Sequence, residues 1–406
     1  MPTLAEPVAK PTPLQLRPFR AVRYDTDRVG DLTDLLAPPY DDLGATRARE
    51  LRRHPHHVAR LLYADAPQAA ARELGRWLRR GVLRRDERPA LYVYQQQRGA
   101  RILQRGLIGD LVLPRHGGRL LPHEDVSAPV VRQRAAHMAG LRAQLEPPLL
   151  ACRGAEPTAA RVAEHVTRRA PVAVAHVGEL THRLWACDDA TEVSLLTSDL
   201  SAGKSLIADG HHRHAACLHL SGDAGSPWDS SLTLLVDTAT YPLQLSAIHR
   251  VMAGLEPEKA AKAASEVARV LPLPTGPRPP EPGELVLTGA EQAWTITDPD
   301  PLALHEALAG HPGRWAQLPA AVSDHLLLRH TWSVPDLPGA VTYVHDIRQA
   351  TAAVAGPDRG SALLLPAISE DTVWELAGAG VRLPRKSTSF GPKPAAGLAM
   401  RVLGLS

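Results

Sequence analysis

A short stretch near the middle of the chain combines residue types that can hold a phosphate group. The segment SLIADGHHRHAACLHL consists of an apolar run followed by Asp209, Gly210, His211, His212 and Arg213. The run predicts a buried strand over 205–209, and the residues after Gly210 predict a helix. The first N–H groups of a helix lack intrahelical acceptors and carry partial positive charge. The turn therefore predicts an anion site, where Gly210 admits close approach and Arg213, His211 and His212 add hydrogen bonds.

The acid of this turn, Asp209, is badly placed to bind an anion itself. Next to a bound phosphate, the Asp209 carboxylate could serve either as a ligand of Mg²⁺ or as a proton acceptor. Two alternatives remain open, because an Asp-Gly pair is often only a turn and a histidine pair often caps a helix. A transition-metal site would draw on Asp209, His211, His212 and His214. Three nearly consecutive residues cannot all face one ion from a regular helix, which disfavours that site.

A second group of candidate residues, Pro122-His123-Glu124-Asp125, precedes a predicted helix over 126–146. A carboxylate at a helix start commonly caps the helix and complements its dipole. This group and the turn at 209–213 are both helix starts that carry histidine and acid. We predict that they line one cleft, with His123 and Glu124 as catalytic candidates.

A third candidate segment, RKSTSFGPK, lies near the end of the sequence. Its basic and hydroxyl side chains are candidates for contact with a nucleotide phosphate: Lys386, Ser387, Thr388 and Lys393. Pro384, Gly391 and Pro392 favour a fixed loop over a floppy one. Solvated surface charge is the alternative interpretation.

The elements that must position these residues predict an α+β protein with mixed sheets. Four consecutive segments are expected: an N-terminal α/β domain over 1–115, a catalytic core over 116–255, a small α/β subdomain over 256–340 and a C-terminal segment over 341–406 that packs back on the core. The Pro-rich stretch 271–284 is expected to be a loop or linker.

Composition narrows the class of protein. The chain has 406 residues and a net charge of +3. This excess of positive charge is too small to indicate a nucleic-acid-binding protein. Three cysteines, Cys152, Cys187 and Cys217, lie far apart, which argues against a disulfide framework or a structural zinc site. The start of the sequence does not read as a signal peptide, and no apolar run reaches the length of a membrane span. We expect a cytoplasmic protein.

The motifs resemble those of a known group of enzymes. ADGHHR is similar to the phosphate-binding motif of free serine kinases of the ParB/sulfiredoxin-like fold, and the upstream His-Glu segment resembles the one those kinases carry. The whole chain resembles a larger, long-uncharacterised family related to them. The pieces RPFRAVRYD, PHED, LIADGHHR, LSAIHRVM, YVHD and LPRKSTSFGPK occur in the order of that family.

The resemblance implies a ParB/sulfiredoxin-like core and phosphoryl transfer from ATP or ADP to the hydroxyl of free L-serine or a related small amino acid. It implies that Glu124 is the base, that Gly210, His211, His212 and Arg213 hold phosphates, and that Asp209 assists the base or Mg²⁺. Nucleotide and amino acid would be the partners, with no membrane and no nucleic acid.

The sequence departs from the pattern of the family after each motif. After ADGHHR, His214-Ala215-Ala216 stand where the family commonly has an aromatic and an acidic residue. Asp125-Val126, after the His-Glu pair, and residues 394–396, after the C-terminal motif, also differ from the residues usual in the family. They leave open an acceptor other than serine, or a loss of activity.

Three rival functions are compatible with these residues. The first is a nucleotide-binding switch or DNA-associated protein, since ParB proteins share the implied fold. The second is a metal-dependent hydrolase built on His123, Glu124, Asp209 and His211. The third is a scaffold that keeps the fold without catalysis. The near-neutral charge and the lack of a recognisable helix-turn-helix disfavour the first.

Overall fold

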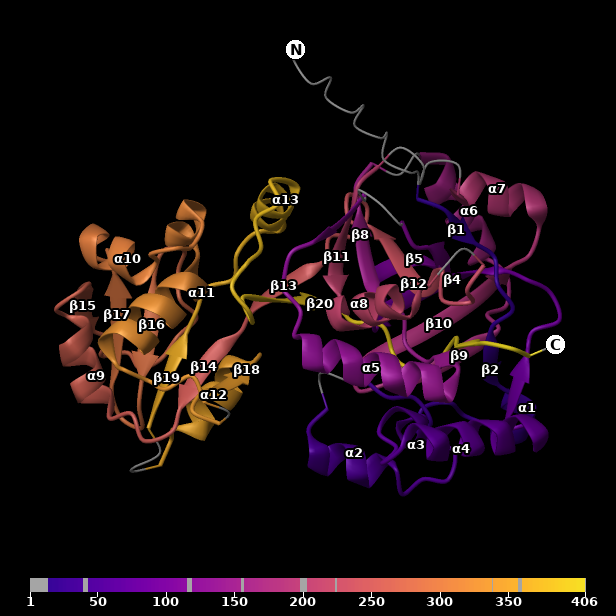
Figure 1. The fold of residues 1–406 in the computed structure, drawn as a ribbon, viewed down its shortest axis with the longest axis horizontal. Helices are drawn as coiled ribbons and strands as arrows, with labels where there is room; N and C mark the ends of the chain where they lie inside the picture. The colour runs from indigo at the N-terminus through magenta and orange to yellow at the C-terminus, as the bar shows by residue number, and fades with distance from the viewer. Residues whose placement is uncertain are drawn as a thin grey trace, which may run out of the picture. The chain divides into compact units, whose positions relative to one another are not determined.

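The chain folds into two compact units, each assembled from segments that are not continuous in sequence. The computed structural model describes residues 14–38, 43–114, 119–154, 157–197, 203–222, 225–337, 339–356 and 360–405. Within these, unit 1 holds the residues up to Pro122, Val126–Leu243 and those from Pro392 onward, and unit 2 holds His123–Asp125 and Gln244–Gly391. Figure 1 colours both units by position along the chain.

Unit 1 is built on a mixed nine-stranded sheet. Its strands, in spatial order, are β6 (Leu120–Pro122), β11 (Ser205–Asp209), β8 (Leu149–Cys152), β12 (Ser230–Asp237), β5 (Arg101–Val112), β4 (Leu91–Arg98), β10 (Leu180–Cys187) and β9 (Ala173–Val177), with β1 (Leu16–Arg17) beside β5. The pairs β11–β6 and β12–β8 are parallel and the others are antiparallel. Strands β8 and β11 are almost continuously apolar and buried, as expected inside a sheet covered on both faces.

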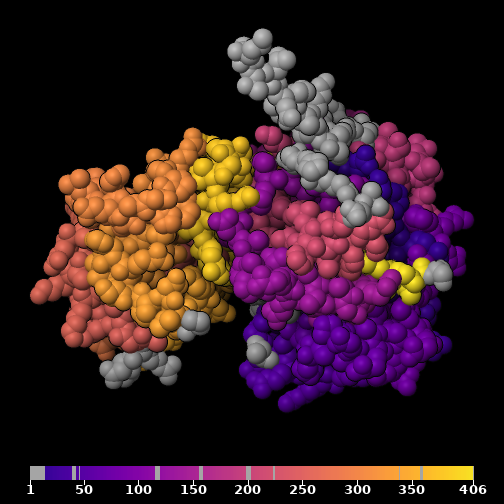
Figure 2. Space-filling view, viewed as in Figure 1, coloured from indigo at the N-terminus to yellow at the C-terminus, as the bar shows by residue number. Residues whose placement is uncertain are grey.

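Helices and two small strand pairs complete unit 1. The helices are α1 (Thr26–Val29), α2 (Ala45–Leu51), α3 (Ala59–Leu62), α4 (Pro67–Arg79), α5 (Ala128–Leu141), α6 (Pro157–Val166), α7 (Ala190–Thr197) and α8 (His211–Leu220). The strand pairs are β2 (Val22–Tyr24) with β3 (Leu83–Arg85), and β7 (Ala143–Gln144) with β21 (Arg401–Val402). Val162 of α6 and Val193 of α7 pack against the sheet's core cluster. Helix α5 contacts both α4 and α8, and the surfaces of α5 and α8 adjoin in Figure 2.

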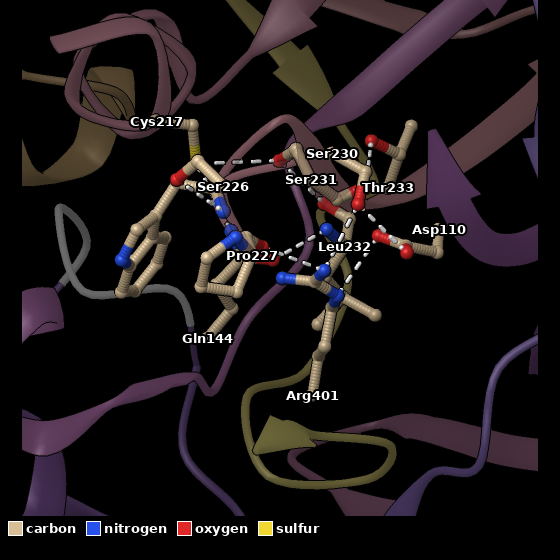
Figure 3. Close-up of polar contacts among 11 residues, drawn as sticks. Asp110, Gln144, Cys217, Ser226, Pro227, Ser230, Ser231, Leu232, Thr233 and Arg401 are labelled. Carbon is tan, nitrogen blue, oxygen red and sulfur yellow. Dashed lines mark hydrogen bonds and ion pairs between the residues drawn. The ribbon is translucent and has the colours of Figure 1, made fainter. Parts of the chain in front are cut away.

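The last described residues of the chain are anchored in unit 1 by a buried polar cluster, drawn in Figure 3. The Nε atom of Arg401 lies 2.9 Å from a carboxylate oxygen of Asp110. Its Nη2 atom donates both to the carbonyl of Pro227 and to the hydroxyl of Ser230, each at 2.9 Å. Ser230 in turn donates to Asp110 at 2.8 Å. The C-terminal segment is thereby fixed to the central strands of the sheet.

Unit 2 contains an antiparallel six-stranded sheet and a separate strand pair. The sheet order is β15 (Arg269–Pro272), β17 (Ala293–Thr297), β16 (Leu285–Thr288), β19 (Ser361–Leu364), β14 (His249–Met252) and β18 (Thr342–Val344), and β13 (Gln244–Ala247) pairs with β20 (Thr388–Gly391). The helices are α9 (Pro257–Ala264), α10 (Pro301–Ala307), a 3₁₀-helix at Gly313–Gln317, α11 (Pro319–Ala321), a π-helix at Val322–Thr331, α12 (Ile347–Ala353) and α13 (Glu370–Gly378).

Both faces of this sheet are covered. The evidence is that two neighbouring residues of β19 pack in different core clusters. Leu363 packs in the cluster that contains residues of α9 and the π-helix. Leu364 packs in the cluster that contains Ala350 of α12. Successive side chains of a strand point to opposite faces, so α9 and α12 lie on opposite sides of the sheet.

The prediction of an α+β protein with mixed sheets is confirmed.

The helix predicted over 126–146 is shorter than expected. Helix α5 ends at Leu141 because Arg142 adopts a left-handed conformation, with φ 55°, and the chain then enters β7. Leu145 therefore lies beyond the helix. In the Pro-rich stretch 271–284, the first two residues belong to β15.

The four consecutive segments expected from the sequence stay a prediction. Strands of 1–115 and of 116–255 pair in the same nine-stranded sheet, and 341–406 contributes residues to both units.

All three cysteines are free thiols. No helix in the described part of the chain combines the length and apolarity needed to cross a membrane.

Candidate functional site

The predicted strand-to-helix turn is present in unit 1. Strand β11 ends at Asp209, Gly210 takes up the change of direction, and α8 begins at His211. The first bond of the helix runs from the N–H of His214 to the carbonyl of Gly210, at 2.9 Å. Gly210 has φ 87° and ψ 30°, a left-handed conformation that lets α8 start directly after the strand.

Gly210 is required for a second reason, which yields a prediction. A Cβ atom at this position would lie 3.0 Å from Nε of Arg213 and 3.1 Å from its Cζ atom. We expect Gly210→Ala to lower the free energy of unfolding by about 1–2 kcal/mol from the left-handed conformation alone. Urea unfolding measures this change. Gly222→Ala, at the other end of α8, is the matched control, because a Cβ there meets no atom within 4 Å. Equal losses in the two variants would contradict the prediction.

The guanidinium group of Arg213 lies inside the turn. It is bonded to the Asp209 carboxylate, donates to the Pro147 carbonyl at 3.0 Å, and its Nε lies 3.6 Å from the Glu146 carboxylate. Only 8% of the Arg213 side chain and 6% of the Glu146 side chain are exposed, so this is a buried charge cluster. The contact of Arg213 with phosphate stays a prediction, and the structure gives the side chain a further role in holding the turn.

Lys393 comes from the far end of the chain to the same turn. Its ammonium nitrogen lies 3.4 Å from Oδ1 of Asp209, and 12% of its side chain is exposed. The segment around it rests on β4: Gln96 donates to the carbonyl of Lys393 at 2.8 Å, and the N–H of Ala395 donates to the hydroxyl of Tyr94 at 3.2 Å. The tertiary structure therefore joins two of the predicted phosphate-contacting segments, the turn and Lys393.

Asp209 does not fit the role of a resident Mg²⁺ ligand in this arrangement. One carboxylate oxygen is bonded to Arg213 and the other faces Lys393. A divalent cation would enter a position already lined by two positive charges, and their repulsion opposes its binding. The geometry instead makes Asp209 the group that orients both cationic side chains at the turn.

His212 connects the two helix starts that the sequence analysis singled out. The N–H of Ser127, the residue before α5, donates to Nε2 of His212 at 3.1 Å. This bond needs an unprotonated Nε2, which places the ring proton of a neutral His212 on Nδ1. The starts of α5 and α8 are therefore side by side in unit 1.

The transition-metal alternative at this turn loses support from the same contacts. Its four residues have different surroundings, since His212 bonds to Ser127 and Asp209 lies between Arg213 and Lys393. Desolvation lowers the pKa of His214 to about 4, and because a neutral imidazole is the form that ligates metals, this shift does not itself weigh against the alternative. His211 is buried at the first position of α8.

His123 and Glu124 belong to unit 2, where they contact the segment that follows α13. The N–H of Leu383 donates to the carbonyl of His123 at 2.8 Å, and Glu124 forms a parallel bridge with Leu383. The His123 ring is buried, with its centroid 5.2 Å from that of Phe390. These contacts fix the backbone on both sides of the Glu124 side chain.

The remaining candidates of the third segment also lie in unit 2. Lys386 has φ 57°, and the Ser387 hydroxyl donates to the carbonyl of Pro384. Thr388 opens β20 opposite Ala247. Within the part of the chain that the structure describes, its buried Oγ1 has no hydrogen-bond partner. An unsatisfied buried hydroxyl is uncommon, and a ligand oxygen is one group that would satisfy it.

Two residues that position the site were missed by the sequence analysis. Glu146 holds Arg213, and Gln96 holds the backbone of Lys393. The position of Glu146 directly before Pro147-Pro148 was only a weak signal. The helix predicted over 126–146 would have made Glu146 its last residue, with no partner indicated. Gln96 is the middle of three consecutive glutamines in β4 and is fully buried, and such a polar run carried no sign that it would hold a distant segment.

Comparison with known proteins places the chain in a family. The family model described as "Protein of unknown function (DUF1015)" matches residues 16–321. The chain belongs to the DUF1015 family. This confirms the resemblance to a long-uncharacterised family, and the match covers the whole of β11, Gly210 and α8. No curated protein matches the chain.

Solved structures similar to this DUF1015 chain are distant. A free serine kinase in complex with AMP is 17% identical, with a TM-score of 0.38, over 67% of this chain and 84% of that one. A conserved hypothetical protein from Pyrococcus furiosus is 16% identical, with a TM-score of 0.37, over 67% and 87%. SbnI from Staphylococcus aureus with a C-terminal truncation is 10% identical, with a TM-score of 0.36, over 67% and 79%.

Proposed function

We propose that the chain is a kinase that transfers a phosphoryl group from ATP or ADP to the hydroxyl of free L-serine or a related small amino acid. The observation that carries this proposal is the turn at Asp209–Arg213, where a left-handed glycine opens α8 and Lys393 arrives from the far end of the chain. A helix start with a lysine beside it is a site for phosphate oxygens. The kinase-like motifs PHED and ADGHHR provide the second line of support. The ParB/sulfiredoxin-like core and the cytoplasmic location stay predictions.

In this proposal the start of α8 and Lys393 bind the phosphates of the nucleotide, and His211, His212 and Arg213 complete the turn. Phosphoryl transfer depends mainly on positioning and charge neutralisation, which backbone N–H groups and a lysine supply. When ATP or ADP binds, its accompanying Mg²⁺ neutralises phosphate charge. Asp209 keeps Lys393 and Arg213 oriented. Lys386, Ser387 and Thr388 are proposed as further contacts to the nucleotide.

Glu124 is proposed as the general base, with His123 beside it. Covalent connectivity supports this role. The chain leaves β6 at Pro122, which pairs with Ile207 of β11, and it returns at Ser127, which bonds to His212 of α8. Glu124 lies between these two anchored points, two residues after the first and three before the second. The serine oxygen would attack the terminal phosphorus, its proton would pass to Glu124, and the nucleotide would leave with one phosphate fewer.

The test is a direct assay of the full chain. Purified protein is incubated with Mg²⁺, with ATP or ADP, and with each hydroxy amino acid in turn, and products are identified by mass. O-phosphoserine, or another phosphorylated amino acid, is the expected result. Hydrolysis of nucleotide that is independent of any amino acid, with no phosphorylated product, would contradict the kinase proposal and favour a nucleotide-binding switch.

The contribution of Lys393 can be measured without turnover. We expect Lys393→Gln to weaken ATP binding at least about tenfold, because a charge-assisted hydrogen bond contributes roughly 1.5–3 kcal/mol. Titration calorimetry with ATP measures the effect. Lys204→Gln, which removes an exposed lysine just before β11, is the matched control for net charge. Identical ATP affinity in the Lys393→Gln variant and the unmodified chain would exclude Lys393 from the nucleotide site.

A further inference from the structure

A pocket of unit 1 that does not include the turn at 209–213 concentrates arginine side chains that the proposed reaction does not use. Its volume is about 490 Å³, within the range of ligand-binding clefts. Four of the ten residues that line it are arginines, namely Arg23, Arg84, Arg85 and Arg88. None of its lining residues belongs to the turn at 209–213 or to the other candidate segments.

The backbone holds like charges together at this pocket. Strands β2 and β3 pair antiparallel, with Arg23 directly opposite Arg84 and Val22 opposite Arg85. Like charges directly opposite each other destabilise a strand pair. Arg20 lies close to the same strands, and burial, followed by the charge of Arg20, lowers the pKa of Arg85. Asp86 already offsets the charge of Arg23, so the charges that a bound anion would offset are those of Arg84, Arg85 and Arg88.

One protein carboxylate, that of Asp86, neutralises one of these arginines, Arg23. Arg23 binds Asp86 through Nε at 2.9 Å and Nη2 at 2.6 Å, and it also donates to the carbonyl of Val172. The hydroxyl of Tyr92 donates to the same carboxylate at 2.6 Å. Asp86 is therefore committed to Arg23 and Tyr92, and the three form a fixed, mostly buried part of the pocket wall.

The remaining arginines are less well compensated. Arg88 lies 3.5 Å from Asp188, but 81% of the Arg88 side chain is exposed, and exposed pairs contribute little. Arg85 donates to a backbone carbonyl, that of Leu405. In the described part of the chain, Arg84 has no hydrogen bond or ion pair from its side chain. Glu87 is the remaining acid of the lining, so the charged side chains leave one positive charge in excess.

We propose that this pocket binds a small polyanion through phosphate or carboxylate oxygens, with Arg84 and Arg88 as its main ligands. The planar guanidinium fork matches two oxygens of such a group at once. Arg85 also lines the pocket, although its side chain is bonded to the carbonyl of Leu405. This site is independent of the proposed kinase reaction and does not require that reaction to exist.

The test is titration calorimetry of the full chain at low ionic strength with inorganic pyrophosphate and, separately, with citrate. We expect saturable binding of at least one of them, weakened about tenfold or more by Arg84→Gln and by Arg88→Gln. Arg161→Gln, an exposed arginine of α6 outside the pocket, is the control for net charge and should bind like the unmodified chain. Binding of pyrophosphate alone assigns a phosphate ligand, and binding of citrate alone assigns a polycarboxylate.

Three outcomes would overturn the proposal. The first is no saturable binding of either anion to the unmodified chain. The second is an equal loss of affinity in Arg161→Gln, which would indicate a general effect of net charge. The third is pyrophosphate binding that Lys393→Gln abolishes and Arg84→Gln leaves intact, which would place the anion at the turn after β11.

Discussion

Glu124→Gln is expected to lower the turnover number for amino-acid phosphorylation by about 10²–10⁴-fold and to leave the affinity for ATP unchanged. Glutamine keeps the size of the side chain and the backbone bridge to Leu383, and it removes the carboxylate that would accept the proton. The phosphates would be held by the turn after β11 and by Lys393, so binding should persist. Steady-state kinetics and ATP titration on the same preparations measure the two effects.

Asp125→Asn is the matched control for this prediction. Its carboxylate is the next one along the chain, 72% of its side chain is exposed, and it lies 3.6 Å from Arg382. It should keep turnover within about twofold, because an exposed ion pair contributes little. Wild-type turnover in Glu124→Gln would remove Glu124 as the base. If the chain has no kinase activity at all, the ATP titration still reports whether the variant binds nucleotide.

The largest expected effect on stability comes from Arg213. We expect Arg213→Met to lower the free energy of unfolding by about 3–5 kcal/mol, because it leaves the buried carboxylate of Glu146 without its cation. The contacts of Arg213 with Asp209 and with the Pro147 carbonyl are lost at the same time. Urea unfolding followed by tryptophan fluorescence gives the change in stability.

A double variant separates this structural role from phosphate binding. Adding Glu146→Leu to Arg213→Met removes the stranded carboxylate, so much of the stability should return. The affinity for ATP should not return with it if Arg213 also contacts phosphate. Unchanged stability in Arg213→Met together with weaker ATP binding would show that the side chain serves the ligand alone.

Local sequence was sufficient to predict the turn, and the reason is physical. Strand β11 has an apolar centre of Leu206, Ile207 and Ala208, Gly210 permits the left-handed conformation, and the residues after it form a helix. Each of these signals acts over a few residues. Helical spacing gave a wrong prediction at Leu145. Its spacing from Leu141 is compatible both with a longer helix and with a helix that ends at Leu141, and only the left-handed conformation of Arg142 decides between these two possibilities.

The partners of the turn could not be predicted, because they depend on strand order and register. Glu146 reaches Arg213 through the segment between β7 and β8, and Lys393 reaches Asp209 because Gln96 of β4 holds its backbone. No periodicity along the chain encodes such contacts between distant segments.

The sequence by itself therefore determined the family motifs, the α+β class with mixed sheets and the local shape of the turn at 209–213. Only the tertiary structure decided that the Asp209 carboxylate lies between two cations, that His212 bonds to the start of α5, and that arginines face each other across β2 and β3. Local conformation follows from the preferences of adjacent residues, whereas the neighbours of a charge are set by which strands pair across the whole sheet.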